Sequence, residues 1–325
     1  MKHFRPLPLL SNPHVQTVLG NLLRWTRDRH PATLRAVALP DGDALALHDA
    51  TPPGWQAGQP IVLLLHGLGG CHQSSYLVRM ANRLAGQGLR AVRLDLRGAG
   101  AGARLARRFY NAACSDDVRA VLAALHAEQP GSPLYVVGFS LGGNVALKLA
   151  GEARATPVAG LAGVAAVGPP IDLARCSVLL TRLPFYDRFY VGHLVRQVRR
   201  QAGHFDDLPV PDFPRGLTLR GFDDIFTAPR WGYADALDYY RRASALPWLP
   251  RIDVPCLVLA ARDDPFVAVE SFEEAAPGPR TRIELATHGG HLGFLGGDGQ
   301  GGIRWAEARV TRWLLECCQM PRRRG

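Results

Sequence analysis

Apolar residues form short continuous runs along the chain, and stretches with helical spacing separate these runs. The runs lie at residues 61–67, 90–96, 134–139, 158–168, 256–261 and 282–287. A continuous apolar run of this length is typical of a strand buried on both faces of a parallel sheet. Helical patterns follow at residues 74–85, 116–129, 141–153 and 302–318, with a short one after Val267. The alternation predicts an α/β fold with a mostly parallel, doubly wound sheet.

Two regions depart from this alternation. Residues 35–50 read as an antiparallel hairpin, with Asp41-Gly42 at the turn between two alternating strands. Residues 171–250 lack the strand pattern and are rich in aromatic residues and arginine with helical spacing. We therefore expect one α/β domain over residues 1–325 that begins with the hairpin and carries a helical cap insertion at 171–250.

Composition and charge narrow the function classes. A chain of 325 residues that is 47% apolar can bury a large core, and its net charge is +10. Nearly all of the positive charge is arginine, spread from Arg5 to Arg324, with lysine only at Lys2 and Lys148. Because no basic patch gathers on one predicted element, we expect no nucleic-acid partner. Peripheral contact with a membrane surface stays open, and the oligomeric state is not predicted.

The cysteines and the N-terminus indicate a cytoplasmic protein. No C-x-x-C pair or disulfide framework occurs, so we expect reduced thiols. The first twelve residues are broken by prolines and are too short for a signal peptide, and no apolar run reaches transmembrane length. The six cysteines are Cys71, Cys114, Cys176, Cys256, Cys317 and Cys318.

A G-x-S-x-G motif gives the strongest local signal for chemistry. It spans residues 138–142, follows a predicted strand and opens a predicted helix, which is the context of a nucleophile elbow. There the helix N-terminus offers free N–H groups and positive potential to an oxyanion. Ser140 is the candidate nucleophile. The alternative is a glycine-rich turn whose serine merely caps the helix.

A serine nucleophile needs a histidine base and an acid that orients it. Asp263 and Asp264 follow the strand at 256–261, and His288 and His291 follow the strand at 282–287. Serine, aspartate and histidine thus appear in this order, each just past the carboxyl end of a strand, as in an α/β-hydrolase. The second requirement is an oxyanion hole, for which the N–H groups of Leu141 and Leu68 are the candidates. We expect His66 to stabilise the loop of Leu68 by hydrogen bonding.

Two other patterns suggest ligands and are weaker. Gly98, Gly100 and Ala103 match a dinucleotide fingerprint, but they lie on a late strand with no acidic residue at the expected distance. His288 and His291 could form a zinc clip, but two glycines separate them and no further ligand is near in sequence. We therefore expect neither a cofactor nor a metal.

Taken together, the motifs SNPHVQT, LPDGD, HGLGG, GFSLGGN, GYADALDYYR, DDPF and HGGHLGF cover nearly the whole chain. They resemble the α/β-hydrolase superfamily, in its branch of bacterial predicted hydrolases and esterases related to eukaryotic lipid acyl-hydrolases and alcohol O-acyltransferases. The resemblance implies an α/β-hydrolase fold and an acyl ester substrate, with Ser140 as nucleophile, His291 as base and an aspartate of DDPF as acid. It leaves His288 as a structural neighbour.

Asp264 is preferred to Asp263 as the acid. Superfamily members resemble G-x-x-D-x-x-V here, which aligns Asp264 with the aspartate, and Pro265 favours an extended conformation at the residue before it. In the predicted cap, residues 222–224 and the motif GYADALDYYR are expected to form a packed helix with tyrosine anchors and an aspartate cap, rather than catalytic groups.

The leading functional prediction is a serine hydrolase that cleaves carboxylic esters of small molecules or lipids through an acyl-enzyme. Two alternatives remain. An acyltransferase would pass the acyl group to an alcohol instead of water, and a catalytically silent hydrolase fold would only bind. The aromatic and aliphatic cap favours an apolar acyl chain.

Overall fold

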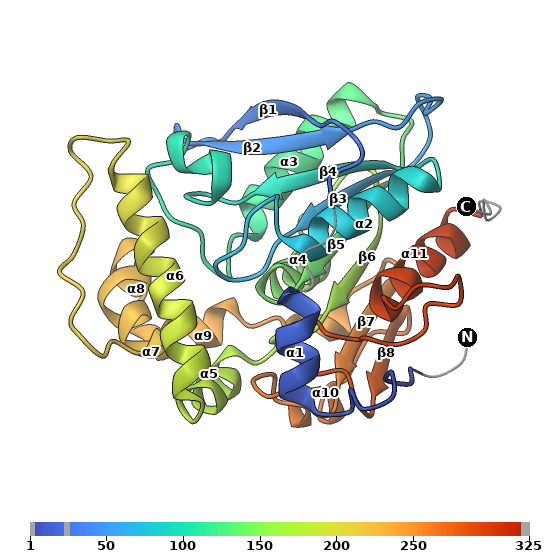
Figure 1. Cartoon of the computed structure of the whole chain (residues 1–325). Helices are drawn as coiled ribbons and strands as arrows, with labels where there is room; N and C mark the ends of the chain where they lie inside the picture. Colours follow the sequence, from blue (N-terminus) through green and yellow to red (C-terminus); the bar gives the residue numbers. More distant parts are fainter. Residues whose placement is uncertain (1–3, 23–26, 320–325) are drawn as a thin grey trace.

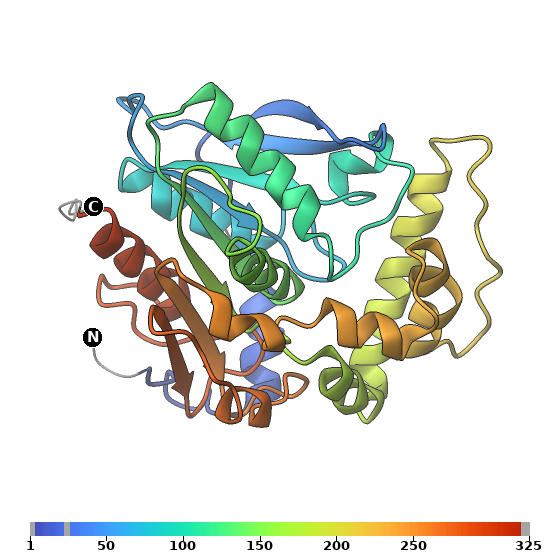
Figure 2. The same cartoon turned by 180° about the vertical axis from the view of Figure 1, so that it is seen from behind.

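The structure is a computed structural model that describes residues 4–22 and 27–319. Within these residues, an eight-stranded sheet lies between two layers of helices (Figures 1 and 2). The spatial order of the strands is β1-β2-β4-β3-β5-β6-β7-β8. Their bounds are β1 Thr33–Ala38, β2 Ala44–Ala50, β3 Ile61–Leu65, β4 Arg90–Asp95, β5 Leu134–Phe139, β6 Leu161–Val167, β7 Cys256–Ala261 and β8 Thr281–Ala286.

Strand direction confirms the predicted fold class. β1 and β2 form an antiparallel hairpin, β2 is antiparallel to β4, and β3 to β8 run parallel. β3 lies between β4 and β5, so the strand order reverses at β3: β4 is added on one side of β3, and β5 to β8 are added on the other. In open α/β sheets, ligands bind outside the carboxyl ends of the strands at such a reversal point. The loop of Leu68, residues 66–74, follows β3 and is called the oxyanion loop below, and Ser140 follows β5.

The two helix layers explain why the strands are apolar throughout. Alternate residues of β3 point to opposite faces, where Val62 and Leu64 meet one set of helices and Leu63 and Leu65 meet the other. The first set is α2 (Ser75–Gly86) and α11 (Trp305–Cys317), and the second includes α3 (Ser115–Glu128) and α4 (Leu141–Glu152). Both faces are therefore buried.

Helix boundaries differ from the predictions by a few residues. The last helix begins at Trp305 rather than near residue 302. The short helix after Val267 is a single turn, α10 (Glu270–Glu273). α3 begins at Ser115, one residue before the predicted start at 116.

The region predicted as a cap is helical in the structure and is called the helical segment below. It lies at the left of Figure 1, beyond the carboxyl ends of the parallel strands. That this segment is a cap inserted into a single α/β domain stays a prediction. Its elements are α5 (Leu173–Thr181), α6 (Pro184–Ala202), α7 (Leu219–Phe222), the π-helix η2 (Asp223–Thr227), α8 (Ala228–Arg230), α9 (Ala236–Ala243) and the 3₁₀-helix η3 (Leu246–Arg251).

Two helical elements were not predicted. α1 (Pro13–Leu22) begins after Asn12, whose side chain accepts the N–H groups of His14 and Val15. Its buried residues include Gln16 and Thr17, so no apolar stripe marks it in the sequence. The second is the 3₁₀-helix η1 (Gly100–Arg104), which occupies the end of the glycine pattern at 98–103.

The remaining predictions concern compartment and thiols. All six cysteines are free. None of the described helices is long and apolar enough to cross a membrane. The N-terminal stretch judged too short for a signal peptide lies partly outside the described residues, because the description begins at Phe4.

Candidate active site

Ser140 occupies a strained turn between β5 and α4. Its φ of 51° lies in the left-handed region, which is costly for a residue with a side chain and is typical of a nucleophile elbow. The glycines on either side are required by contact: a Cβ at Gly138 would lie 2.2 Å from the carbonyl oxygen of Gly142, and one at Gly142 would lie 2.5 Å from that of His66. The turn therefore explains the G-x-S-x-G pattern, and it holds Ser140 at the N-terminus of α4.

The structure brings three of the predicted residues into one hydrogen-bonded chain. His291 Nε2 lies 2.9 Å from Ser140 Oγ, and His291 Nδ1 lies 2.8 Å from Asp264 Oδ2. With a proton on Nδ1, His291 donates to Asp264 and its Nε2 is free to accept the hydroxyl proton of Ser140. The other carboxylate oxygen of Asp264 accepts the N–H groups of Phe266 and Val267, both at 3.1 Å. The aspartate is thus fixed from two sides.

Helix α1 holds the loop that carries His291. The N–H of His291 donates to Thr17 Oγ1 at 2.8 Å, and the N–H of Leu295 donates to Gln16 Oε1 at 2.7 Å. Gly290 has φ +54°, and a Cβ there would lie 2.3 Å from the carbonyl oxygen of Pro13. The sequence pattern alone assigns no role to the motif SNPHVQT. Its threonine and glutamine position the histidine loop, and their polarity is the signal that sequence reasoning missed.

The second predicted oxyanion donor lies in a loop whose other N–H groups are occupied. Leu68 follows Gly67, where a Cβ would lie 3.0 Å from the Cβ of Ser140. Among the described residues, neither Leu68 nor Leu141 has an acceptor for its N–H, although both line the pocket at Ser140. The neighbouring N–H groups all have acceptors. Gly67 donates to Tyr76 Oη, Gly69 donates to Tyr110 Oη, and Gly70 donates to the carbonyl of Gly67. Cys71 donates to Ser74 Oγ, and His72 donates to Asp95 Oδ1.

His66 has the supporting role that was expected of it. Its Nδ1 lies 2.8 Å from the carbonyl oxygen of Gly67, and its Nε2 accepts the N–H of Leu96 at 3.2 Å. Burial lowers the pKa of His66, so the ring stays neutral. Both ring nitrogens therefore bind backbone groups and join the oxyanion loop to the loop after β4.

His288 lies apart from the serine. Its Nδ1 is 3.3 Å from Asp263 Oδ2, and Asp263 Oδ1 accepts the N–H of Gly290 at 2.9 Å. The pair thus fastens the loop before His291. His288 and His291 engage different aspartates, and this geometry does not bring their imidazoles to a common point.

A narrow pocket of about 100 Å³ opens on Ser140 and His291. Helices of the helical segment cover it with apolar side chains, among them Leu173, Leu180 and Phe222, and Phe266 and Val267 close it beside Asp264. Pockets for drug-sized ligands measure roughly 300–1,000 Å³. A slim or short apolar group therefore fits this one better than a whole lipid.

Comparison with known proteins agrees with the fold and the motifs. The family model described as "alpha/beta hydrolase fold" matches residues 60–206. "Putative esterase YheT" of Escherichia coli (strain K12) is 34% identical over 319 residues, which cover 96% of this chain and 92% of that protein. The chain belongs to the α/β-hydrolase family.

Two further proteins are similar to this α/β-hydrolase, one in sequence and one in structure. The monoacylglycerol lipase of Saccharomyces cerevisiae is 28% identical over 270 residues, which cover 79% of this chain and 59% of the lipase. The solved structure of the Pyrococcus furiosus esterase Pf2001 matches with a TM-score of 0.60 at 16% identity, over 97% of this chain and 98% of the esterase. The chain thus falls among family members that include proteins named as esterases and lipases, and the structural match supports the fold.

The α/β-hydrolase pocket also contains a buried carboxyl group that sequence reasoning assigned to packing alone. Asp223, in η2, accepts a hydrogen bond from Tyr240 Oη at 2.7 Å, and both residues line the pocket. Burial raises the pKa of Asp223 to about 7, although hydrogen bonds with Thr227 and Tyr240 act in the opposite direction. The expected tyrosine anchors are present, since Tyr239 Oη also accepts the N–H of Ala112. They form, together with Asp223, a polar wall of the pocket.

Proposed function

We propose that this α/β-hydrolase is a serine esterase that cleaves carboxylic esters through an acyl-enzyme. The observation that carries the proposal is the continuous hydrogen-bonded chain from Asp264 through His291 to Ser140 at the pocket. This is the arrangement of nucleophile, base and orienting acid that makes a serine hydroxyl reactive at neutral pH. The names of the relatives support an ester or lipid substrate.

The first half of the reaction forms the acyl-enzyme. His291 Nε2 takes the proton of Ser140 as Oγ attacks the ester carbonyl carbon, and Asp264 stabilises the imidazolium that results. The N–H groups of Leu68 and Leu141 donate to the tetrahedral oxyanion, each contributing about 3 kcal/mol to the transition state. The imidazolium then gives its proton to the oxygen of the leaving alcohol, and the carbon–oxygen bond of the ester breaks.

In the second half, water releases the acyl group. His291 removes a proton from water as the water oxygen attacks the acyl carbon, and the same N–H groups receive the second oxyanion. Collapse of this intermediate returns the proton to Ser140 Oγ and releases the carboxylic acid. No cofactor takes part in this scheme.

The substrate side of the proposal rests on the pocket. Apolar side chains form most of its lining, so an apolar acyl group fits there, and its small volume favours a slim chain. Asp223 and Tyr240 give the wall a polar part that can bind a hydroxyl or carbonyl of the substrate.

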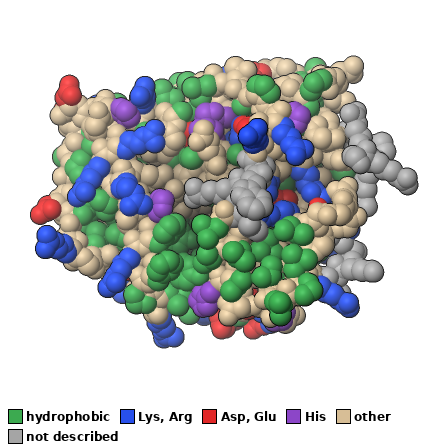
Figure 3. Space-filling model, in the orientation of Figure 1, with side chains coloured by type: hydrophobic (Ala, Val, Ile, Leu, Met, Phe, Trp, Pro, Cys, Tyr) green, Lys and Arg blue, Asp and Glu red, His purple; other side chains and the backbone are tan. Residues whose placement is uncertain are grey.

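Exposed apolar side chains are compatible with substrates drawn from a membrane surface. They gather over the lower half of the face in Figure 3, where Figure 1 shows α1 and α5. Together with the net charge of +10, they support peripheral contact with an anionic bilayer as part of this proposal. The exposed large apolar side chains on α1, α5 and α6 are Val18, Leu22, Val178, Phe185 and Phe189.

Hydrolysis of p-nitrophenyl esters with acyl chains of increasing length tests the proposal. We expect the unaltered protein to release p-nitrophenol and Ser140→Ala to stay at the background rate. Because an acyltransferase would form the same acyl-enzyme, the products are also analysed by mass spectrometry with ethanol added. Free acid as the main product supports the esterase, ethyl ester as the main product replaces it by the transferase, and equal rates for Ser140→Ala contradict both.

A further inference from the structure

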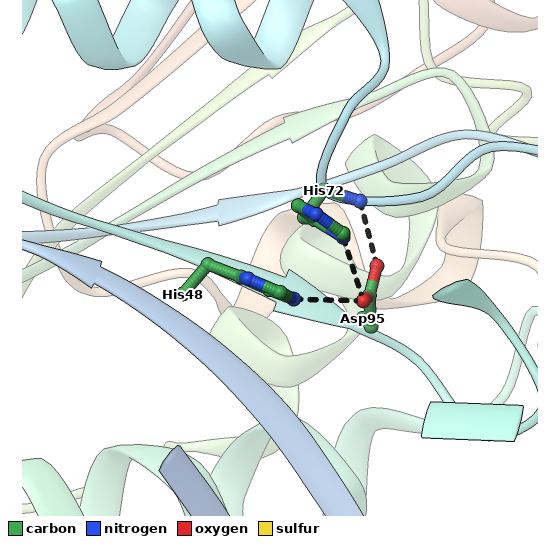
Figure 4. A group of neighbouring side chains, drawn as sticks. All are labelled: His48, His72 and Asp95. Carbon is green, nitrogen blue, oxygen red and sulfur yellow. Dashed lines mark hydrogen bonds and ion pairs between the residues drawn. The ribbon is translucent and has the colours of Figure 1, made fainter. Parts of the chain in front are cut away.

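Two imidazoles and a carboxylate converge at a second place, outside the chain of Ser140, His291 and Asp264. His48 Nε2 lies 2.9 Å from Asp95 Oδ2, and His72 Nδ1 lies 2.8 Å from the same oxygen (Figure 4). One donor atom from each of the three residues lies within 4.8 Å of the other two. His48 belongs to β2, Asp95 ends β4, and His72 lies in the oxyanion loop after β3.

The register of the sheet brings the first two residues together. Ala46 lies opposite Asp95 in the antiparallel pair of β2 and β4, so His48, two residues along β2, is a diagonal neighbour of Asp95 on the same face. His72 is held separately, because its backbone N–H donates to Asp95 Oδ1 at 2.6 Å. The two imidazole rings are stacked, with centroids 3.4 Å apart and planes 11° from parallel.

Charge balance at Asp95 calls for a cation. The side chain of Asp95 is fully buried, and both of its carboxylate oxygens accept hydrogen bonds. Among the described residues, no arginine or lysine forms an ion pair with Asp95, and the side chains that contact its carboxylate are those of His48 and His72. Buried carboxylates are paired with a cation or coordinate a metal.

The neighbouring His66 shows what a purely structural histidine looks like in this loop. Both of its ring nitrogens contact backbone groups, whereas His48 and His72 each direct a nitrogen at one carboxylate oxygen. That oxygen also accepts the N–H of Ala101 at 2.9 Å, and a Cβ at Gly100 would lie within 2.3 Å of it. The glycine pattern that resembles a nucleotide fingerprint therefore wraps the carboxylate.

The spacing suits a small divalent ion. Ligand atoms of a tetrahedral zinc site lie about 3.3 Å apart, so the two nitrogen–oxygen distances need to open by about half an ångström. The side chains of His48 and His72 are 11% and 16% exposed, so water can reach both rings and supply further ligands. Imidazole nitrogens with one carboxylate suit zinc and its transition-metal neighbours rather than calcium or magnesium.

We propose that His48, His72 and Asp95 bind one divalent transition-metal ion of the zinc class. The ion joins β2, the end of β4 and the oxyanion loop, and so stabilises the loop that carries Leu68. It takes no part in the ester chemistry, and the proposal does not rest on the proposed function. It departs from the sequence-based expectation of no metal, because the three ligands are 24 and 23 residues apart along the chain.

Zinc titration of tag-free protein tests this site. The protein is treated with a chelator, returned to metal-free buffer and titrated with Zn²⁺, and bound metal and the melting temperature are measured. We expect one equivalent per chain and a higher melting temperature. His48→Ala and His72→Ala should bind roughly 10- to 100-fold more weakly or worse. His288→Ala, which alters a histidine paired with a different aspartate, should bind like the unaltered protein.

Co²⁺ added to the unaltered protein provides a readout that needs no variant. We expect visible d–d absorption bands that saturate at one equivalent and disappear on competition with Zn²⁺. The proposal is overturned if the protein takes up no stoichiometric Zn²⁺ or Co²⁺, or if His72→Ala binds as tightly as His288→Ala. Either result would leave hydrogen bonds, and no metal, as the link among His48, His72 and Asp95.

Discussion

Two histidine–aspartate pairs lie next to each other in the same two loops, and they differ in their surroundings. His291 Nδ1 is 2.8 Å from Asp264 Oδ2, and these side chains are 3% and 1% exposed. His288 Nδ1 is 3.3 Å from Asp263 Oδ2, and these are 42% and 18% exposed. Residue type and order along the chain are the same, so burial and the neighbour on the far side of each imidazole distinguish the pairs.

The comparison shows what makes one such pair suitable for catalysis. A hydrogen bond shielded from water is stronger and better oriented than one at the surface, where solvent competes. Only the buried pair reaches a serine, since His291 Nε2 lies 2.9 Å from Ser140 Oγ. Thr17 and the N–H groups of Phe266 and Val267 then fix the positions of His291 and Asp264. The exposed pair supports the loop instead.

Replacing the two histidines gives the largest expected contrast. His291→Ala removes the base and should lower kcat/KM for a p-nitrophenyl ester by roughly 10⁴- to 10⁶-fold. His288→Ala removes one partly exposed hydrogen bond and should change kcat/KM by less than about tenfold. Comparable losses in both variants would contradict the assignment of His291 as the base.

Replacing the two aspartates tests the same comparison at the acid. Asp264→Asn should lower kcat by about 10⁴-fold, because an amide no longer stabilises the imidazolium and no longer favours the neutral tautomer of His291 with its proton on Nδ1. Asp263→Asn keeps an oxygen for the N–H of Gly290 and should cost less than about tenfold. The reverse order would identify Asp263 as the acid and show that the loop rearranges in solution.

Removing the contact from α1 should have a smaller effect. Thr17→Val keeps the shape of the side chain but leaves the N–H of His291 without its acceptor, which should lower kcat by about tenfold with little change in KM. Thr181→Val is the control, because the Thr181 hydroxyl donates only within α5. An unchanged kcat in Thr17→Val would mean that α1 does not position the histidine.

A carboxyl group without a histidine provides the last contrast. The pKa of Asp223 is raised to about 7 from an ordinary value of 3.8, so between about pH 4 and pH 7 the folded protein holds a proton that the unfolded chain has released. The contribution of Asp223 to stability should fall as pH rises through this window, by on the order of 1.4 kcal/mol per pH unit.

Asp223→Asn keeps an acceptor for Tyr240 but cannot ionise. Its free energy of unfolding, measured by urea denaturation, should rise relative to that of the unaltered protein between pH 5 and pH 8. Parallel pH profiles for the two proteins would show that Asp223 has an ordinary pKa.

The sequence could predict the parts that depend on pattern along the chain. Continuous apolar runs indicated β3, β5 and β7 because both faces of these strands are buried, and the tight turn at Ser140 requires the glycines that identify it. The order of Ser140, Asp264 and His291 followed from strand ends that meet at one edge of the sheet. Their roles stay predictions until variants are measured.

Patterns along the chain could not predict contacts between distant segments. Helix α1 buries Gln16 and Thr17 instead of apolar residues, so its packing on the loop of His291 left no periodic signal. Asp223 was assigned to helix packing because the sequence does not show that η2 faces the pocket. The cluster of His48, His72 and Asp95 depends on strand register, whereas the adjacent His288 and His291, which suggested a metal by spacing, engage separate aspartates.

The rate of labelling by a fluorophosphonate most directly tests whether Asp264 and His291 activate Ser140. The probe reacts with an activated serine and needs no knowledge of the natural substrate. We predict that the unaltered protein, His288→Ala and Asp263→Asn are labelled at Ser140 at similar rates, and that His291→Ala, Asp264→Asn and Ser140→Ala are not labelled above background. Labelling of Ser140→Ala, or loss of labelling in His288→Ala while His291→Ala still reacts, would contradict the account.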